Sequence, residues 1–266
     1  MLFSLKDKVS VVTGAMGLLG KQHCVALSEA GAKVVVADLD REGCERLARE
    51  FGSQSIGVGL NVNDKASLQA GLQQIESQLG GIDILVNNAA INDMFENPVV
   101  AGEQSRLENY PEAMWRKMID VNVTGVFLCS QVLGSSMARR GKGSIINIGS
   151  TYGMVGPNQD LYQDAQGKQL FYKSPAYSAS KGAVIALTRY LAAYWGRSGV
   201  RVNTLSPGGV ENHQDEHFVQ AYAQKTPLGR MAVPSDYRGA IVFLASDASA
   251  YMTGANLVVD GGWTAW

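Results

Sequence analysis

Short runs of β-branched and aliphatic residues alternate with longer segments of helical periodicity along the entire chain. This alternation is typical of repeated βαβ units around a buried parallel sheet, because each crossover helix must cover one face of that sheet. We therefore predict an α/β fold with a doubly wound, seven-stranded parallel sheet and helices on both faces. Since the alternation never breaks, we expect residues 1–266 to form a single domain.

The expected strands are residues 9–12, 33–37, 55–59, 84–86, 144–148, 201–205 and 256–259. The expected helices are residues 18–30, 41–50, 65–79, 111–138, 175–195 and 234–245. Ligands of such folds bind beyond the carboxyl ends of the strands. Small or polar residues do follow the strands at six places, in chain order a glycine-rich turn, Asp38, Asn61, Asn87-Asn88-Ala89, Ser150 and Pro207-Gly208. We expect them to share one rim of the sheet.

The composition predicts an ordinary globular protein that acts on small molecules. Hydrophobic residues make up 46% and charged residues 18%, with a net charge of -1, so the chain lacks the charge excess that keeps chains disordered. Lys and Arg are scattered rather than striped, and we therefore expect neither nucleic acid nor an anionic membrane as a partner. A small-molecule substrate is the expected partner.

The N-terminus and the cysteines indicate the compartment. The first expected strand begins so early that no secretory signal fits before it, and we expect no apolar run of membrane-spanning length. Cys24, Cys44 and Cys129 form neither a CxxC pair nor a metal-ligand spacing, which fits a reducing compartment. We predict a cytoplasmic protein.

A glycine-rich turn joins the first expected strand to the first expected helix. Gly14, Gly17 and Gly20 allow a tight turn there, and the amides of the helix N-terminus can face a pyrophosphate. Asp38 ends the second strand, where its carboxylate can accept the ribose hydroxyls of an adenosine and repel a 2′-phosphate. The glycine-rich turn and Asp38 together predict NAD rather than NADP as the cofactor. Arg41 is the one nearby cation that could weaken this preference. The alternative is a glycine-rich turn without a ligand.

Tyr177 and Lys181 are four residues apart at the start of an expected helix, so both lie on one helical face. A phenol with a pKa of about 10 is a poor base at neutral pH, but a neighbouring ammonium favours the phenolate. The spacing indicates a proton-transfer pair. An ordinary Tyr/Lys helix pair is the alternative.

Together these motifs resemble the short-chain dehydrogenase/reductase superfamily over nearly the whole chain, which implies a Rossmann fold. The resemblance rests on the glycine-rich turn, Asp38, Asn87-Asn88-Ala89, Asn122, Ser150, Tyr177 with Lys181, Pro207-Gly208 and the Val-Asp-Gly-Gly ending at residues 259–262. It implies that Ser150 hydrogen-bonds the substrate oxygen, Tyr177 transfers the proton, Lys181 tunes Tyr177, and Asn122 holds a water that connects Lys181 to solvent. The implied cofactor contacts are Gly14, Gly17, Leu18, Leu19, Asp38, Leu39, Asn61, Val62, Asn88, Ala89, Ala90, Tyr177, Lys181, Pro207, Gly208 and Val210.

The chain departs from the family pattern at several points. Leu18 stands where the turn usually has a glycine, Asn61 where an aspartate is common, and Asn212 where a threonine often holds the carboxamide. Two segments are longer than usual, near residues 91–112 and 151–176. Both begin beside the chemistry, and they supply Phe95, Tyr110, Tyr162, Phe171, Tyr172, Arg106, Lys168 and Lys173. Our hypothesis is a pocket wall for a bulky polar substrate such as a sugar derivative, the alternative being subunit contact or surface decoration.

Residues 209–228 are expected to form a polar lid that excludes water during hydride transfer, as the resemblance implies. Within this segment His213 and His217 are four residues apart beside carboxylates, but the pattern is not HExxH. We interpret it as a solvated helix and predict no metal site.

The leading hypothesis is an NAD(H)-dependent oxidoreductase that interconverts an alcohol and a carbonyl, with a sugar-like substrate. The alternatives are a nucleotide-sugar epimerase or dehydratase with tightly held NAD, and a catalytically silent NAD-binding module. The chain also resembles a bacterial branch linked to flagellin or surface-glycan sugar modification. By resemblance we expect a homotetramer or a homodimer.

Overall fold

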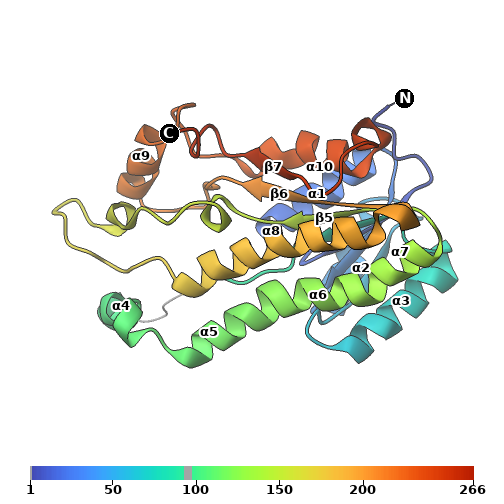
Figure 1. Cartoon of the computed structure of the whole chain (residues 1–266), viewed down its shortest axis with the longest axis horizontal. Helices are drawn as coiled ribbons and strands as arrows, with labels where there is room; N and C mark the ends of the chain where they lie inside the picture. The colour runs from blue at the N-terminus through green and yellow to red at the C-terminus, as the bar shows by residue number, and fades with distance from the viewer. Residues whose placement is uncertain (1, 93–97) are drawn as a thin grey trace.

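The structure, a computed structural model, describes residues 2–92 and 98–266. One seven-stranded sheet organises it, with the strand order β3-β2-β1-β4-β5-β6-β7 (Figure 1). Every neighbouring pair of strands is parallel. The strands are β1 Val9–Thr13, β2 Lys33–Asp38, β3 Ile56–Gly59, β4 Ile84–Asn87, β5 Gly143–Ile148, β6 Val200–Pro207 and β7 Asn256–Val259. The predicted number and direction of strands are confirmed, with ends shifted by one or two residues.

The helices lie on both faces of this sheet (Figure 1). They are α1 Leu18–Glu29, α2 Arg41–Arg49, α3 Lys65–Leu79, α4 Pro98–Gln104, α5 Glu112–Ile119, α6 Gly125–Cys129, α7 Ser135–Arg139, α8 Pro175–Trp195, α9 Glu216–Gln224 and α10 Arg238–Ala245. The α5–α7 run and α8 lie alongside each other on one face, whereas α1 and α10 pack on the other. This arrangement is the doubly wound α/β fold that the sequence predicted.

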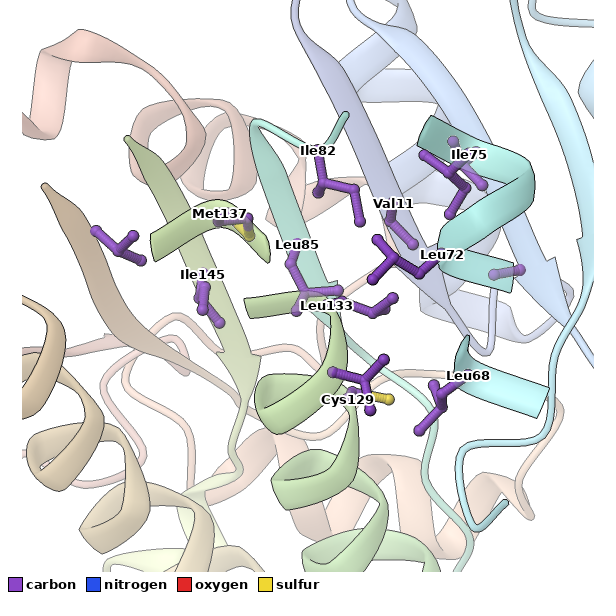
Figure 2. Close-up of a cluster of buried hydrophobic side chains, with 14 of the residues drawn as sticks. Val11, Leu68, Leu72, Ile75, Ile82, Leu85, Cys129, Leu133, Met137 and Ile145 are labelled. Carbon is purple, nitrogen blue, oxygen red and sulfur yellow. The ribbon is translucent and has the colours of Figure 1, made fainter. Parts of the chain in front are cut away.

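Strand side chains alternate between two cores, as the two-residue period of a strand requires. On one face, Val11, Leu85 and Ile145 pack against α3 and the α5–α7 run (Figure 2). On the other face, Val12 and Ile146 pack with residues of α1 and α10. Both faces are apolar, so the strands appear in the sequence as nearly continuous hydrophobic runs.

The expected helix at residues 111–138 is not one regular α-helix. It begins at Glu112, and π-helical turns interrupt it at Asp120–Thr124 and Ser130–Gly134. Such turns change the rotation of the side chains that follow, an effect that hydrophobic spacing does not report. By length and composition the stretch Glu112–Arg139 could cross a membrane, contrary to our expectation that no run was long enough. Its apolar side chains are explained by packing, because Cys129, Leu133 and Met137 are buried against the sheet.

The two long segments contain structure that the sequence did not predict. The first includes α4, and the second includes single 3₁₀ turns at Thr151–Gly153 and Gln159–Tyr162. The segments also contact each other, since the Tyr172 amide donates to Ser105 Oγ at 2.8 Å and Ser174 Oγ donates to the Tyr110 hydroxyl at 3.0 Å. They form one continuous wall.

The expected lid at residues 209–228 contains α9, which packs against this wall through a third apolar cluster. The cluster joins Tyr162 of the second long segment, Tyr222 of α9 and Trp263 near the C-terminus. The rings of Tyr222 and Trp263 stack with centroids 4.1 Å apart, and the Gly209 amide donates to the Tyr222 hydroxyl at 2.7 Å. The expected lid is therefore anchored by two segments that are far from it in the sequence, those of Tyr162 and Trp263.

His23 of α1 is fully buried, and neither ring nitrogen has a hydrogen-bond partner within the described ranges. Burial lowers the pKa of this imidazole from its ordinary value of 6.5 to about 4. The unfolded chain therefore takes up a proton more readily, and stability is lost as the pH falls from 6.5 towards 4.

We expect acidification from pH 7 to pH 4.5 to cost wild type about 2–3 kcal/mol more in free energy of unfolding than the variant His23→Leu. Denaturant unfolding of both proteins at the two pH values measures this difference. Exposed His217→Leu is the matched control and should keep the wild-type pH dependence. Equal pH dependence in wild type and His23→Leu would contradict the assignment.

Candidate active site

A groove of about 510 Å³ runs along the carboxyl ends of β1, β2, β3 and β4. The structure brings eleven of the predicted cofactor residues together in its lining: Gly14, Gly17, Leu18, Leu19, Asp38, Leu39, Asn61, Val62, Asn88, Ala89 and Ala90. Leu60, Asn63, Ile91, Lys117 and Val121 line it as well. Sequence reasoning did not assign these five to the cofactor, although Val121 stands next to Asn122 in one of the family motifs.

The glycine-rich turn is bonded directly to the end of β4. Thr13 Oγ1 accepts from the amides of Asn88 and Ala89, each at 3.1 Å. In return Asn88 Nδ2 donates to the carbonyls of Thr13 and Gly14 at 3.0 and 2.9 Å. Gly14 has a φ of 61°, and a Cβ there would lie 2.7 Å from the Ala89 Cα. Only glycine fits at this close approach of two loops.

Asp38 holds its carboxylate at the end of β2 through two backbone amides. Oδ2 accepts from Met16 of the glycine-rich turn at 2.9 Å, and Oδ1 accepts from Leu39 at 2.8 Å. The negative charge is thus fixed in the groove lining. Arg41, the cation that could offset this charge, is paired with Glu45 at 2.9 Å.

The N-terminus of α1 differs from those of the next two helices. Asp40 and Asp64 cap α2 and α3 by accepting backbone amides, whereas the N-cap of α1 is Gly17, which has no side chain to do so. The first turn of α1 also carries no acidic residue. A helix start of this kind suits the phosphates of a dinucleotide. The groove residues therefore fit a nicotinamide dinucleotide cofactor.

A second pocket, of about 450 Å³, adjoins the groove and shares Leu18, Asn88 and Ile91 with it. Three of the predicted catalytic residues, Ser150, Tyr177 and Lys181, lie in its wall. So do Pro207, Gly208 and Val210, the predicted cofactor contacts after β6, together with Asn212. The three predicted catalytic residues thus lie where the groove meets the second pocket.

Ser150 and Tyr177 are paired at this junction. Ser150 follows β5, and its hydroxyl accepts from the Tyr152 amide at 3.2 Å. Tyr177 enters α8 one turn after the cap residue Ser174, whose hydroxyl accepts the Tyr177 amide at 3.2 Å. Burial raises the pKa of the Tyr177 phenol, and a hydrogen bond from Ser150 opposes that rise.

Lys181 is buried one helical turn beyond Tyr177. Its Nζ donates to the Ile148 carbonyl at 2.8 Å and lies 5.8 Å from the centroid of the Tyr177 ring. Burial lowers the pKa of this ammonium to about 8. Burial is the largest influence on the Tyr177 phenol and raises its pKa. The sequence predicted that Lys181 lowers this pKa, and that role stays a prediction.

Asn122 lies in the first π-helical turn and is buried. Its Oδ1 accepts from the Ile91 amide at 2.8 Å, and its Nδ2 donates to the Ile91 carbonyl at 2.9 Å and to Ser180 Oγ at 3.2 Å. The side chain therefore ties the loop after β4 to the α5–α7 run and to α8. The resemblance implied that Asn122 holds a water, and that role stays a prediction.

The long segments contribute to the second pocket unequally. Tyr162 and Lys173 line it, and Lys173 Nζ lies 4.7 Å from the centroid of the Tyr177 ring. Arg106 and Tyr172 line a neighbouring cavity of about 400 Å³ instead. Tyr110 is hydrogen-bonded to Ser174, and Phe171 packs on Tyr162. Lys168 is exposed, and Phe95 lies outside the described residues. Sequence reasoning missed Tyr152, Phe218, Tyr222 and Met231 as pocket residues.

His213 and His217 are both exposed, and α9 begins between them at Glu216. A search of residues 2–92 and 98–266 finds no group of three or more His, Cys, Asp or Glu side chains placed to hold a metal ion.

Comparison with known proteins identifies the family. The chain matches the family model of the short chain dehydrogenases over residues 8–223. It is 35% identical over 272 residues to galactitol 2-dehydrogenase (L-tagatose-forming) of Cereibacter sphaeroides, covering 100% of this chain and 98% of the relative. It is 36% identical over 270 residues to D-threitol dehydrogenase of Mycolicibacterium smegmatis, covering 98% and 95%.

Among solved structures, a gluconate 5-dehydrogenase from Burkholderia cenocepacia in complex with NADP and tartrate is similar, with a TM-score of 0.87 and 32% identity. The similarity covers 100% of this chain and 98% of that one. The chain therefore belongs to the short-chain dehydrogenase family. Within it, the chain is an oxidoreductase of alcohol and carbonyl groups that binds a nicotinamide cofactor.

Proposed function

We propose that this protein is an NAD(H)-dependent oxidoreductase that interconverts an alcohol and a carbonyl on a polyhydroxylated, sugar-like substrate. The observation that carries the proposal is the position of Ser150, Tyr177 and Lys181 where the cofactor groove meets the second pocket. When bound, the nicotinamide supplies or accepts the hydride. The chain's own residues hold the substrate and move the proton.

Tyr177 would exchange the proton with the substrate oxygen through its phenol oxygen. Ser150, which already hydrogen-bonds that phenol, would also hydrogen-bond the substrate oxygen and keep the two oxygens together. Lys181, fixed by the Ile148 carbonyl, would stabilise the phenolate. Asn122 would hold the loop after β4 against the helices that carry this pair.

Support for NAD rather than NADP comes from Asp38. Its carboxylate is fixed by two backbone amides in the groove lining, and Arg41 is engaged with Glu45. The Burkholderia gluconate 5-dehydrogenase is in complex with NADP, so family membership does not supply the preference. The proposed preference for NAD rests on the charge of Asp38 in this chain.

We expect NADH to bind about tenfold or more tightly than NADPH, because the Asp38 carboxylate would repel the 2′-phosphate. Asp38→Asn should narrow the ratio of the two dissociation constants, measured by cofactor fluorescence titration. Asp40→Asn is the matched control, since Asp40 is exposed and caps α2 instead. Equal affinity of wild type for both cofactors would contradict the preference.

Support for a polyhydroxylated substrate comes from the polar wall of the second pocket. Asn92, Asn212, Gln214 and Lys173 line it beside several tyrosines. Three of the similar proteins point the same way, since galactitol, threitol and gluconate are all polyhydroxylated.

The test is NAD-linked turnover of a panel containing polyols, aldonic acids, hydroxysteroids and hydroxyacyl thioesters. Turnover of the polyhydroxylated members supports the proposal, and turnover of none contradicts it. An epimerase or dehydratase would instead retain its cofactor, so denaturation of the purified protein would release NAD in a 1:1 ratio. A silent binding module would bind NADH and turn over nothing in the panel.

We further propose a cytoplasmic homotetramer or homodimer. Its three cysteines are free and buried, which suits a reducing compartment. Tyr190 and Tyr194 of α8 are exposed with their rings stacked, and Trp115 and Phe127 of the α5–α7 run are also exposed. Exposed aromatic residues on long helices suit contacts between subunits.

A further inference from the structure

Two tyrosine hydroxyls meet in the wall of the second pocket. The hydroxyls of Tyr152 and Tyr162 are 3.1 Å apart, and either can be the donor. Tyr152 lies in the 3₁₀ turn that follows Ser150, and Tyr162 ends the second 3₁₀ turn of the same long segment. Both residues line the pocket together with Tyr177.

The pair keeps hydrogen-bonding capacity after its own bond is made. One phenol uses its proton in the bond, and the other still has a proton to donate, while both oxygens retain acceptor capacity. A substrate hydroxyl is likewise one donor and two acceptors. The pair can therefore bind such a hydroxyl with a donated and an accepted bond, whereas an apolar substrate would leave a pocket donor unpaired at a cost.

The surroundings fix the pair in place. Tyr162 is 7% exposed, and its ring packs on Phe171 and on Phe218 of α9, with centroid distances of 4.9 and 5.7 Å. The Tyr152 amide is bonded to Ser150 Oγ, so this tyrosine is joined to a catalytic residue. Hydroxyls held this rigidly distinguish between substrates better than mobile ones, because little side-chain entropy is lost when the substrate binds.

The pair also lies close to the reacting group. Burial raises the pKa of Tyr152 and of Tyr162, and the charge that Tyr177 carries as a phenolate adds to both rises. Tyr152 is bonded to Ser150 through its amide, and both tyrosines line one pocket with Tyr177. A hydroxyl bound by the pair would therefore belong to a carbon near the one that is oxidised. Apolar rings around the pair suit the C–H faces of a sugar chain.

We propose that the Tyr152–Tyr162 hydroxyl pair is the specificity element that binds a second hydroxyl of the substrate, next to the hydroxyl that Tyr177 deprotonates. The inference rests on the proposed function and narrows its substrate to vicinal diols and longer polyols.

The experiment compares three alcohols of one chain length in NAD-linked turnover: threitol, butane-2,3-diol and butan-2-ol. Galactitol, hexane-2,3-diol and hexan-2-ol form a second series of six carbons. Wild type should prefer the polyol and the diol over the mono-alcohol. Tyr162→Phe and Tyr152→Phe should each lower kcat/KM for the polyols and the diols by about 10- to 100-fold. The kcat/KM for the mono-alcohols should change less than about threefold.

The control variant is Tyr251→Phe, which removes a fully exposed tyrosine hydroxyl and should leave kcat/KM unchanged for the diols and for the mono-alcohols. An equal loss for diol and mono-alcohol would show that the pair only supports the fold, and would overturn the inference. Wild-type activity without any preference for diols would also overturn it, while leaving the proposed function intact. Binding of NADH without turnover of either series or of the wider panel would overturn the proposed function itself.

Discussion

Tyr177→Phe should lower kcat/KM for alcohol oxidation by about 10²- to 10⁴-fold, the range expected when a positioned proton-transfer group is removed. The substitution deletes the phenol oxygen that Ser150 hydrogen-bonds and keeps the ring that fills the pocket wall. The Kd for NADH should change far less, because the groove contacts at the glycine-rich turn and Asp38 are untouched.

Steady-state turnover and NADH fluorescence titration of the same preparations measure both effects. Tyr251→Phe is the matched control, since it removes a tyrosine hydroxyl at a fully exposed position. If Tyr177→Phe kept wild-type turnover, proton transfer by this phenol would be disproved. A parallel loss of NADH binding would instead assign Tyr177 mainly to the cofactor site.

Gly20→Ala should damage both the fold and the cofactor groove. A Cβ at Gly20 would lie 2.2 Å from the Gly14 carbonyl oxygen and 2.8 Å from the Ala15 Cα, and both are backbone atoms that cannot rotate away. The first turn of α1 must move off the glycine-rich turn. We expect a loss of about 3 kcal/mol in the free energy of unfolding and a NADH affinity lower by about 10- to 100-fold.

Thermal unfolding and NADH titration test this prediction. The control is Gly239→Ala in α10, where a Cβ would meet nothing within 4 Å. At this exposed helix position the change should leave stability unchanged or raise it by up to about 1 kcal/mol. If Gly20→Ala behaved like Gly239→Ala, the close approach of α1 to the turn would not matter for binding.

The fold could be predicted because its sheet is buried on both faces. Each strand then appears as a short apolar run, and each crossover helix must follow it within a few residues. The ends of those strands mark the rim, since Asp38 is the last residue of β2 and Ser150 follows β5 by two residues. Tyr177 and Lys181 were predictable as neighbours because four residues make one helical turn.

Other features could not be predicted, because they depend on contacts between segments distant in the chain. The apolar residues around Asn122 and Ser130 follow a helical period in the sequence, so the hydrophobic pattern does not reveal the two π-helical turns there. α4 has only seven residues and no strong period. The pairing of Tyr152 with Tyr162 needs the long segment to fold back on itself.

The sheet, its helical layers and the rim on which the predicted reactive residues lie could all be inferred from the sequence, because they follow from local periodicity and chain order. The burial of the Tyr177 phenol, which raises its pKa, and the polar lining of the pocket beside it became visible only in the folded structure. Burial and long-range hydrogen bonds arise when the chain packs, and residue spacing carries no record of them.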